Sequence, residues 1–327
     1  MHGTRSAIAL TERLGGAYDH ARGQTLAREV ALFTDHGGMF TTPGEVRRRS
    51  SLIVFIGDIS DRHRELLQEW ATTQPDLGDR RKRVWFHISG DTADTGRKPA
   101  RKPKLIPIGA KGLSLGAALA IFRAELRGGP TTASLSNMEH FRKALAVSRF
   151  PVFVFSGNSG ETPDLVMLQG LVADLNRTQR ASSLFLPADD DAWGTALTSL
   201  WMTGFPPRTG FINSLPSYDP GRWDIQRMIR DKEADVHVWM STGGGETSPR
   251  GGKIAVISLC RTEAPTPGAS VTISVGKAGL DHDGVRWSSR TGTFRSMQAT
   301  QPSQLPSIPL ILGKLAQALP GRKALPC

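Results

Sequence analysis

Short runs of apolar residues alternate along the chain with longer segments whose apolar residues recur every three or four positions. The short runs end in Gly, Ser or Asp, which is typical of buried strands that lead into a turn. The longer segments show the spacing of helices that bury one face. Strands that alternate with helices assemble into a mostly parallel sheet covered by helices, so the pattern predicts an α/β fold.

The predicted strands show little polar alternation, as expected for parallel strands buried on both faces. They cover residues 52–56, 84–88, 152–155, 184–186, 236–240, 254–259 and 271–275. The predicted helices cover residues 63–72, 115–126, 138–147, 165–180, 192–202, 223–231 and 308–319. From residue 276 onward the strand signals weaken while Gly, Ser and Thr become frequent, so we expect an extended C-terminal tail over 276–327.

Length and composition limit the class of protein. The chain has 327 residues, 39% of them hydrophobic, which suffices for two domains with buried cores. Its two cysteines allow neither a disulfide framework nor a paired-cysteine metal site, and we expect Cys260, inside an apolar run, to pack as a small hydrophobe. No apolar run reaches the roughly 18 residues of a membrane span. We therefore expect a cytoplasmic protein.

The formal net charge of +11 suits an anionic partner, which could be nucleic acid, a phosphorylated cofactor, a polyacid or an acidic protein surface. Two basic runs, residues 80–83 and 97–104, flank the strand 84–88 within an exposed basic loop that we expect over 76–107. The runs could be solvated loops or could bind an anionic partner. The residues predicted to contact such a partner are Arg81, Arg83, Arg101 and Lys104, and we expect the fold to survive their replacement by serine.

Small residues follow the predicted strand 152–155 at a strand-to-helix turn. Free backbone N–H groups at such a turn can hold a phosphate against the helix N-terminus. The alternative is a tight turn that caps the helix. The loop matches neither a Walker sequence nor a GxGxxG fingerprint. Its candidate cofactor-binding residues are Ser156, Gly157, Asn158, Ser159 and Gly160.

A second glycine-rich loop follows the predicted strand 236–240, at the carboxyl end where open α/β sheets place their ligands. Thr242, Gly243 and Gly244 could cradle an anion there, or could form a flexible loop. Both loops are candidate remnants of an anion-binding site.

No pattern of catalytic or metal-binding residues stands out. The eight histidines form no zinc-binding spacing, and residues 281–283 (DHD) lie in the Gly-rich tail, where we expect an exposed turn. The basic runs lack the interleaved aromatic residues that platforms for single-stranded nucleic acid need, so nucleic-acid binding is disfavoured. We therefore predict no catalytic residue and no metal site.

Three passages carry a more specific signal. Residues 40–58 read FTTPGEVRRRSSLIVFIGD, residues 86–95 read FHISGDTADT, and residues 203–222 read TGFPPRTGFINSLPSYDPGR. In this order they resemble the B subunit of formylmethanofuran dehydrogenase, a relative of the molybdopterin oxidoreductases. The match is to the shortened B subunit of bacterial formyltransferase/hydrolase complexes.

The resemblance implies a truncated, molybdopterin oxidoreductase-like α/β fold with two interleaved Rossmann-like lobes. We expect residues 1–47 and 150–275 to form the first lobe and residues 48–149 to form a second lobe inserted in it. Residues 276–327 would then form the extended tail.

This chain departs from the family at the positions that bind the metal and the iron–sulfur cluster. Catalytic members carry an N-terminal cysteine cluster for a [4Fe–4S] centre, and a metal-binding Cys or selenocysteine after a GG-x-x-D-N passage. Here residues 15–20 read GGAYDH and lead into Ala21 and Arg22, so no sulfur ligand stands in the expected place. The loops at 57–60 and 241–245 also depart from the family. We expect no molybdopterin, molybdenum, tungsten or iron–sulfur cluster in this chain.

The resemblance further implies a subunit of a complex in tetrahydromethanopterin-dependent one-carbon metabolism. That complex moves a formyl group to a methanofuran-like amine and hydrolyses it to formate. The formyltransferase subunit, the zinc-dependent hydrolase subunit and the C subunit would be partners, and this chain would be a non-catalytic scaffold. Its basic surface would meet an acidic subunit or the polyglutamate tail of the furan carrier, and deletion of residues 303–327 would weaken assembly.

Two other hypotheses stay open. The chain could be a degenerate oxidoreductase that still holds a pterin or nucleotide at the loops after residues 57, 156 and 242. It could also be an independent anion- or RNA-binding protein that uses the basic loop.

Overall fold

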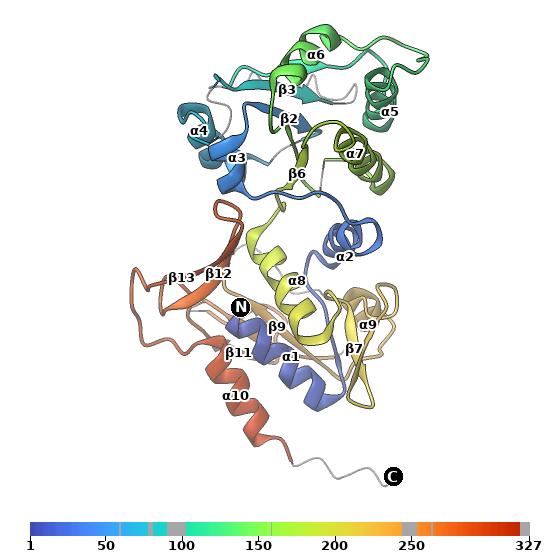
Figure 1. Ribbon diagram of the computed structural model, residues 1–327. Helices are drawn as coiled ribbons and strands as arrows, with labels where there is room; N and C mark the ends of the chain where they lie inside the picture. The colour runs from blue at the N-terminus through green and yellow to red at the C-terminus, as the bar shows by residue number, and fades with distance from the viewer. Residues whose placement is uncertain are drawn as a thin grey trace. The chain divides into compact units, whose positions relative to one another are not determined.

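The structure is a computed structural model that describes residues 1–58, 60–77, 81–89, 103–157, 159–243, 254–262 and 264–320. The chain divides into two compact units (Figure 1). Unit 1 comprises residues 1–27, 190–287 and the chain from 294 onward, and unit 2 comprises residues 28–189 and 288–293. The chain leaves unit 1 within α2 (Gly23–Ala31) and returns to it at the start of α8 (Asp190–Thr203). No described helix combines the length and the apolar character needed to cross a membrane.

A five-stranded sheet forms the centre of unit 2. Its strands, in spatial order, are β4 (Ile106–Ile108), β3 (Val84–Ile88), β2 (Leu52–Ile56), β5 (Val152–Phe155) and β6 (Ser182–Phe185). Every neighbouring pair is parallel. All five strands therefore begin at one edge of the sheet, the amino edge, and end at the opposite, carboxyl edge.

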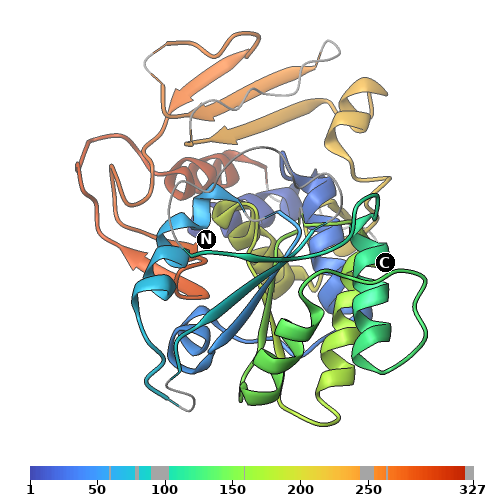
Figure 2. The same ribbon diagram turned by 90° about the horizontal axis from the view of Figure 1, so that it is seen from above.

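Helices cover both faces of this sheet. Val54 of β2 packs into the core formed with α5, α6 and α7, while Ile53 and Phe55 pack against α3 and α4. In Figure 2, α4 and α5 accordingly lie on opposite sides of the sheet. All five residues of β2 are buried, which explains its lack of polar alternation. The helical elements of unit 2 after α2 are η1 (Leu32–His36), α3 (Pro43–Arg49), η2 (Asp61–His63), α4 (Arg64–Thr72), α5 (Leu115–Leu126), α6 (Met138–Val147) and α7 (Thr162–Leu175).

Unit 1 contains a second parallel sheet in the order β11 (Val271–Ser274), β10 (Ala255–Cys260) and β9 (Val236–Ser241). The first helix, α1 (His2–Leu14), and the last, α10 (Ile308–Ala318), pack together with this sheet. Leu10, Leu259 and Leu312 meet in their shared core. The two ends of the described chain therefore stabilise the same sheet.

Apart from α8, which has 14 residues, the other described elements of unit 1 are short. An antiparallel sheet has the order β1 (Ala17–Tyr18), β7 (Thr209–Ile212) and β8 (Leu215–Tyr218). Helix α9 (Ile225–Arg230) follows β8, and β12 (Gly284–Ser288) pairs with β13 (Thr293–Met297). The tight turn between β7 and β8 uses Asn213 and Ser214, both at positive φ, as hairpins of this kind require.

The prediction of an α/β fold with a parallel sheet and covering helices is confirmed. Strands 52–56, 84–88 and 152–155 and helices 115–126 and 138–147 have the predicted bounds. The exposed turn expected at 281–283 is wrong for its first residue, because Asp281 is buried and its Oδ2 lies 2.8 Å from Nε of Arg261.

The lobe boundaries differ from those predicted. Residues 150–189 were expected in the first lobe, yet β5 pairs directly with β2 and β6 pairs with β5. These strands complete the sheet that begins with β2, so the second unit runs from residue 28 to 189. Residues 276–320 also depart from an extended tail, because they form β12, β13 and a helix whose Leu312 is buried against α1 and the sheet of unit 1. Within the basic loop 76–107, β4 pairs with β3, and residues 78–80 and 90–102 lie outside the described residues.

Candidate functional site

A buried arginine, Arg208, lies at the centre of a polar cluster in unit 1. Its backbone adopts a φ of 74°, a left-handed conformation that residues other than glycine rarely take. The N–H of Arg208 donates to the carbonyl of Tyr18 at 3.1 Å, and its carbonyl accepts from the N–H of Asp219 at 3.3 Å. A conformation of this kind costs on the order of 1 kcal/mol, so these contacts and those of the side chain must hold it in place.

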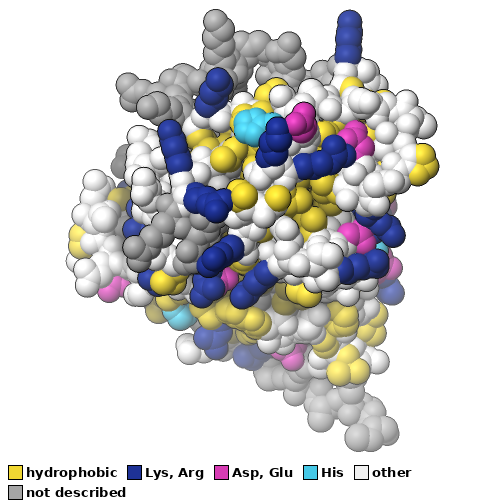
Figure 3. Space-filling model, turned by 45° about the horizontal axis from the view of Figure 1, so that its top comes forward, with side chains coloured by type: hydrophobic (Ala, Val, Ile, Leu, Met, Phe, Trp, Pro, Cys, Tyr) yellow, Lys and Arg dark blue, Asp and Glu magenta, His cyan; other side chains and the backbone are white. Residues whose placement is uncertain are grey.

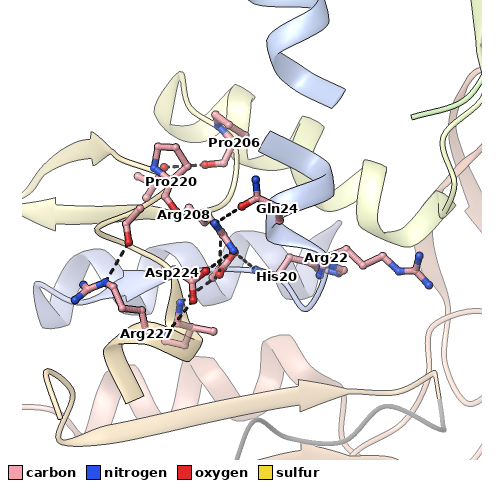
Figure 4. Close-up of polar contacts among 12 residues, drawn as sticks. His20, Arg22, Gln24, Pro206, Arg208, Pro220, Asp224 and Arg227 are labelled. Atoms are coloured by element: carbon pink, nitrogen blue, oxygen red, sulfur yellow. Dashed lines mark hydrogen bonds and ion pairs between the residues drawn. The ribbon is translucent and has the colours of Figure 1, made fainter. Parts of the chain in front are cut away.

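Acceptors from four segments of unit 1 surround the guanidinium of Arg208 (Figure 4). Nη2 donates to Oδ2 of Asp224 at 2.6 Å, and Nη1 donates to Oε1 of Gln24 at 2.9 Å and to the carbonyl of Pro220 at 2.7 Å. Nε lies 3.4 Å from Oδ2 of Asp19. The side chain thereby joins the segment after β1, the first turn of α2, the loop after β8 and the N-terminus of α9.

Asp19 is the more deeply buried carboxylate of this cluster. Its side chain is 3% exposed, whereas that of Asp224 is 25% exposed. Oδ1 accepts from the N–H of His20 at 2.7 Å, and Oδ2 accepts from the N–H of Ile225 at 3.3 Å. Burial raises the pKa of Asp19 to about 6, although these hydrogen bonds and the charge of Arg208 oppose the rise. Asp19 can therefore gain or lose a proton close to neutral pH.

Glycine and a helix cap make this dense arrangement possible. A Cβ atom at Gly23 would lie 2.0 Å from Oδ1 of Asp19 and 2.9 Å from Nε of Arg208, so no larger residue fits there. Asp224 is the N-cap of α9, since its Oδ1 accepts from the N–H of Arg227 at 3.0 Å while its Oδ2 binds Arg208. One carboxylate therefore serves both the helix and the cluster.

A cavity of about 510 Å³ opens beside the cluster. Its lining is polar and rich in arginine, but Nη1 of Arg227 is paired with Glu233 at 2.5 Å and with Asp231 at 3.3 Å. The described lining has no Ser, Cys, Lys or His, and its one carboxylate, Asp224, already accepts from Arg208 and from the N–H of Arg227. The cavity can therefore bind a polar molecule, but it presents no uncommitted nucleophile. The lining residues are Gln24, Arg208, Pro220, Gly221, Asp224, Gln226, Arg227 and Arg230.

The predicted loop at 156–160 lies in unit 2, and its described polar groups contact other groups of the chain. The N–H of Ser156 donates to Oγ of Ser159 at 2.7 Å, and that hydroxyl donates to the carbonyl of Asp58 at 3.2 Å. A Cβ atom at Gly157 would lie 1.9 Å from Oε1 of the buried Glu29. A Cβ atom at Gly160 would lie 2.9 Å from Oδ2 of Asp164, which forms a capping box with Glu161 at the start of α7. Carboxylates therefore lie directly against Gly157 and Gly160, and Asn158 lies outside the described residues.

The other predicted loop lies in unit 1, at the carboxyl end of β9. Thr242 is partly buried and Gly243 is exposed, while Gly244 lies outside the described residues. Among the described residues, the two predicted loops therefore belong to different units, and neither contributes to the lining of the cavity beside Arg208.

The structure corrects the prediction that Arg83 contacts an anionic partner. Arg83 is 9% exposed, and its guanidinium donates to the carbonyls of Arg47, Trp70 and Thr73 near the C-terminal ends of α3 and α4. Nε donates to the carbonyl of Ser50 at 2.9 Å. Burial and the neighbouring Arg47 lower the pKa of Arg83 to about 10. The residue is a buried brace between two helix ends, and an external partner cannot reach it.

The other predicted partner-binding cations are at the surface or undescribed. Arg81 and Lys104 are exposed in unit 2, and Arg101 lies outside the described residues. Lys and Arg side chains are spread over the face drawn in Figure 3, with Asp and Glu among them at only a few places. The structure separates the buried Arg83 from these surface charges, which the sequence could not do.

Comparisons with known proteins place these features in context. No family model matches the chain. The B subunit of the formyltransferase/hydrolase complex (Fhc) of Methylorubrum extorquens is 28% identical over 311 residues, which cover 93% of this chain and 82% of that protein. The chain is related to this Fhc protein. A chain in the crystal structure of the same organism's complex, with methylofuran bound, is similar with a TM-score of 0.81 and 26% identity, and the match covers 97% of this chain and 87% of that one.

This relationship confirms the resemblance seen in the three sequence passages. The third passage, residues 203–222, supplies Arg208 and ends just before Asp224, while residues 15–20 supply Asp19. The cluster itself could not be read from the sequence, because Asp19 and Arg208 are far apart in the chain and the positive φ of Arg208 gives no sequence signal. The one local clue is Asp224, an N-cap residue type directly before Ile225, Met228 and Ile229, which have helical spacing.

Proposed function

We propose that this chain is a B-type subunit of a formyltransferase/hydrolase complex in one-carbon metabolism. The observation that carries the proposal is the likeness to the Fhc B subunit along 93% of the chain, together with the TM-score of 0.81 to a chain of the complex. A likeness of this extent covers both units rather than one shared domain. The partners would be the hydrolase, formyltransferase and C subunits, and the location would be the cytoplasm.

Within that complex we assign the chain a structural rather than a catalytic role. The described lining of the cavity beside Arg208 has no Ser, Cys, Lys or His, its one carboxylate is engaged by Arg208 and by the N-terminus of α9, and Arg208 binds groups of the chain itself. In the described residues, no group of three or more His, Cys, Asp or Glu side chains is arranged to hold a metal. The passage that would lead to a metal-binding thiolate continues with Ala21 and Arg22, so its donors do not fit molybdenum or tungsten.

The fold would be a truncated form of the molybdopterin oxidoreductase type. Each unit has a parallel sheet of the kind found in Rossmann-like lobes, and unit 2 is inserted between residues 27 and 190 of unit 1. The loop at 156–160, with Glu29 at Gly157 and a capping box at α7, suits a former anion site now occupied by the chain's own carboxylates.

Reconstitution tests the proposed function. The hydrolase, formyltransferase and C subunits from the same source would be co-expressed with and without this chain, with the affinity tag on one of those three. We expect the chain to be retained in stoichiometric amount and formate release from the formylated carrier to require it. If the other three subunits assemble and release formate equally well without the chain, the proposal is wrong.

Elemental analysis tests the structural role. Because the chain has no thiolate in the metal position, we expect no molybdenum, tungsten or iron assigned to this chain in the purified four-subunit complex. Zinc of the hydrolase subunit should be present and serves as the internal control for metal retention during purification. About one atom of molybdenum or tungsten per copy of this chain would instead support the degenerate oxidoreductase.

A further inference from the structure

The amino edge of the sheet in unit 2 gathers positive charge from every strand connection. Because all five strands are parallel, the segments that lead into β2, β3, β4, β5 and β6 meet at this one edge. Each of these segments carries exposed or half-exposed cations shortly before its strand begins. In the spatial order of the strands from β4 to β6, they are Lys104, Arg81, Lys82, Arg48, Arg49, Arg149, Arg177 and Arg180.

Carboxylates balance only part of this charge. Nη2 of Arg48 lies 3.0 Å from Oδ2 of Asp76, and Arg177 lies 3.7 Å from Asp174. Arg49 pairs with Glu45 at 3.4 Å. Within the described part of the chain, no carboxylate pairs with Lys82, Lys104 or Arg149. The edge therefore keeps a net positive charge.

The C-terminal ends of helices offset another part of the positive charge at the amino edge. Helices α3 to α7 end at this edge, and the partial negative charge of a helix C-terminus favours nearby cations. Arg83 fulfils that role, since it is buried and donates to carbonyls near the ends of α3 and α4. Lys82 and Arg149 differ from it because they are exposed and make no such hydrogen bond within the described residues. Their positive charge faces solvent.

Apolar side chains lie among these cations. Leu77, whose N–H donates to the carbonyl of Arg48, is 37% exposed. Val147, the last residue of α6, is 48% exposed and precedes Ser148, whose Oγ lies 3.5 Å from that of Ser51, the residue before β2. Exposed apolar groups ringed by charge are typical of protein interfaces, whereas a surface that binds only a polyanion needs cations alone.

We propose that the amino edge of the unit 2 sheet docks an acidic surface of a neighbouring protein subunit. This inference rests on the proposed function and adds the face through which the chain binds. The cations would pair with carboxylates of the partner, and Leu77 and Val147 would be covered. Complementary charge of this kind raises the association rate and makes it sensitive to salt.

The test compares two double variants with the same change in net charge. Lys82→Glu with Arg149→Glu alters the amino edge. Arg64→Glu with Lys111→Glu alters exposed positions that follow β2 and β4 at the carboxyl edge of the same unit. Affinity of the full-length chain for the remaining subunits would be measured at about 50 and about 200 mM salt. The matched neutral pair, Lys82→Gln with Arg149→Gln, separates loss of attraction from introduced repulsion.

We expect the amino-edge Glu variant to bind the other subunits about tenfold or more weakly at low salt and with a flatter salt dependence. The neutral variant should fall between it and the wild type, and the carboxyl-edge variant should stay within about twofold. If the wild type assembles but the amino-edge and carboxyl-edge variants behave alike, this inference is wrong while the proposed function stands. If the wild type does not assemble, both fail. Loss of binding to polyglutamate without loss of assembly would assign the edge to a polyanion and overturn docking of a protein.

Discussion

Arg83 and Arg208 show how the surroundings of a cation decide its role. Both are buried arginines whose donors are directed at groups of the chain itself. Arg83 binds backbone carbonyls at two helix ends, and Arg208 binds Asp224 and lies beside Asp19. From the sequence, Arg83 is indistinguishable from Arg81 and Lys82, its exposed neighbours in the run. Only packing around α3 and α4 determines which member of the run faces inward.

Substitution of Arg83 by serine should destabilise unit 2. The change leaves several buried carbonyls without a donor, and each unsatisfied buried group costs about 1–3 kcal/mol, so a loss of about 3 kcal/mol in the free energy of unfolding is expected. The adjacent Lys82→Ser is the control, because Lys82 is exposed and surface changes stay within about 0.5 kcal/mol. Urea denaturation measures the free energy of unfolding of both variants. Equal stability of the two variants would show that Arg83 does not brace the helix ends.

Asp19 should make the stability of unit 1 depend on pH. Burial raises its pKa from 3.8 to about 6, so the folded chain keeps a proton that the unfolded chain releases between these values. The stabilisation from the protonated form is therefore full below about pH 4 and is lost as pH rises through about 6. A shift of this size corresponds to about 3 kcal/mol.

The variant Asp19→Asn isolates this effect. Relative to the variant, the wild type should lose about 3 kcal/mol between pH 4 and pH 7, as measured by urea denaturation at both values. Asp58→Asn, at an exposed position, controls for removal of a carboxylate at the surface. A constant difference between wild type and Asp19→Asn across this range would rule out proton uptake by Asp19.

At the scale of elements, the sequence predicts best where local pattern and burial agree. Strand β2 is apolar throughout and fully buried, helix α5 is an almost continuous apolar segment, and helix α6 has clear periodicity, so their bounds follow from the pattern. Helix α3 was missed although its signals are present: Thr42 accepts from the N–H of Glu45 as N-cap, and Pro43 occupies the first turn. Its length of seven residues is too short for periodicity to be visible.

The C-terminal region shows where local signals fail. Its many Gly, Ser and Thr residues resemble a loosely structured tail, but β12 and β13 pair with each other and α10 packs on α1, far away in sequence. Such contacts cannot be inferred from composition, because they depend on which distant face the helix covers. Deletion of residues 303–327 was predicted to weaken assembly of the complex. The structure offers a second role for this region, because α10 forms part of the core of unit 1.

Leucine truncation on α10 distinguishes these roles. Leu312 is 1% exposed in the core with Leu10 and Leu259, so Leu312→Ala should lower the free energy of unfolding by about 3 kcal/mol. Leu310 on the same helix is 50% exposed, and Leu310→Ala should change stability far less. Thermal or urea unfolding of the isolated chain measures the stability of both leucine variants. Unchanged stability of the Leu312 variant would mean that α10 does not stabilise unit 1.

At the scale of the whole molecule, the net charge of +11 indicated an anionic partner without saying where it binds. The parallel sheet of unit 2 indicates a location, because it brings separate basic segments together at its amino edge. The family could be predicted from three sequence passages, whereas the boundary between units could not. Strand β5 joins β2 through pairing between residues about a hundred positions apart, which local pattern does not reveal.

Native mass spectrometry of the protein isolated from its own cells tests the central claim most directly. The tag would be placed at the N-terminus of this chain. If the chain is a subunit of a formyltransferase/hydrolase complex, the main species should contain it together with the hydrolase, formyltransferase and C subunits in fixed ratio, and dissociation in the gas phase should release a 35.4 kDa chain plus the tag. Recovery of the tagged chain as a free 35.4 kDa species or as an oligomer of itself alone, under conditions that keep the other subunits assembled, would contradict the account.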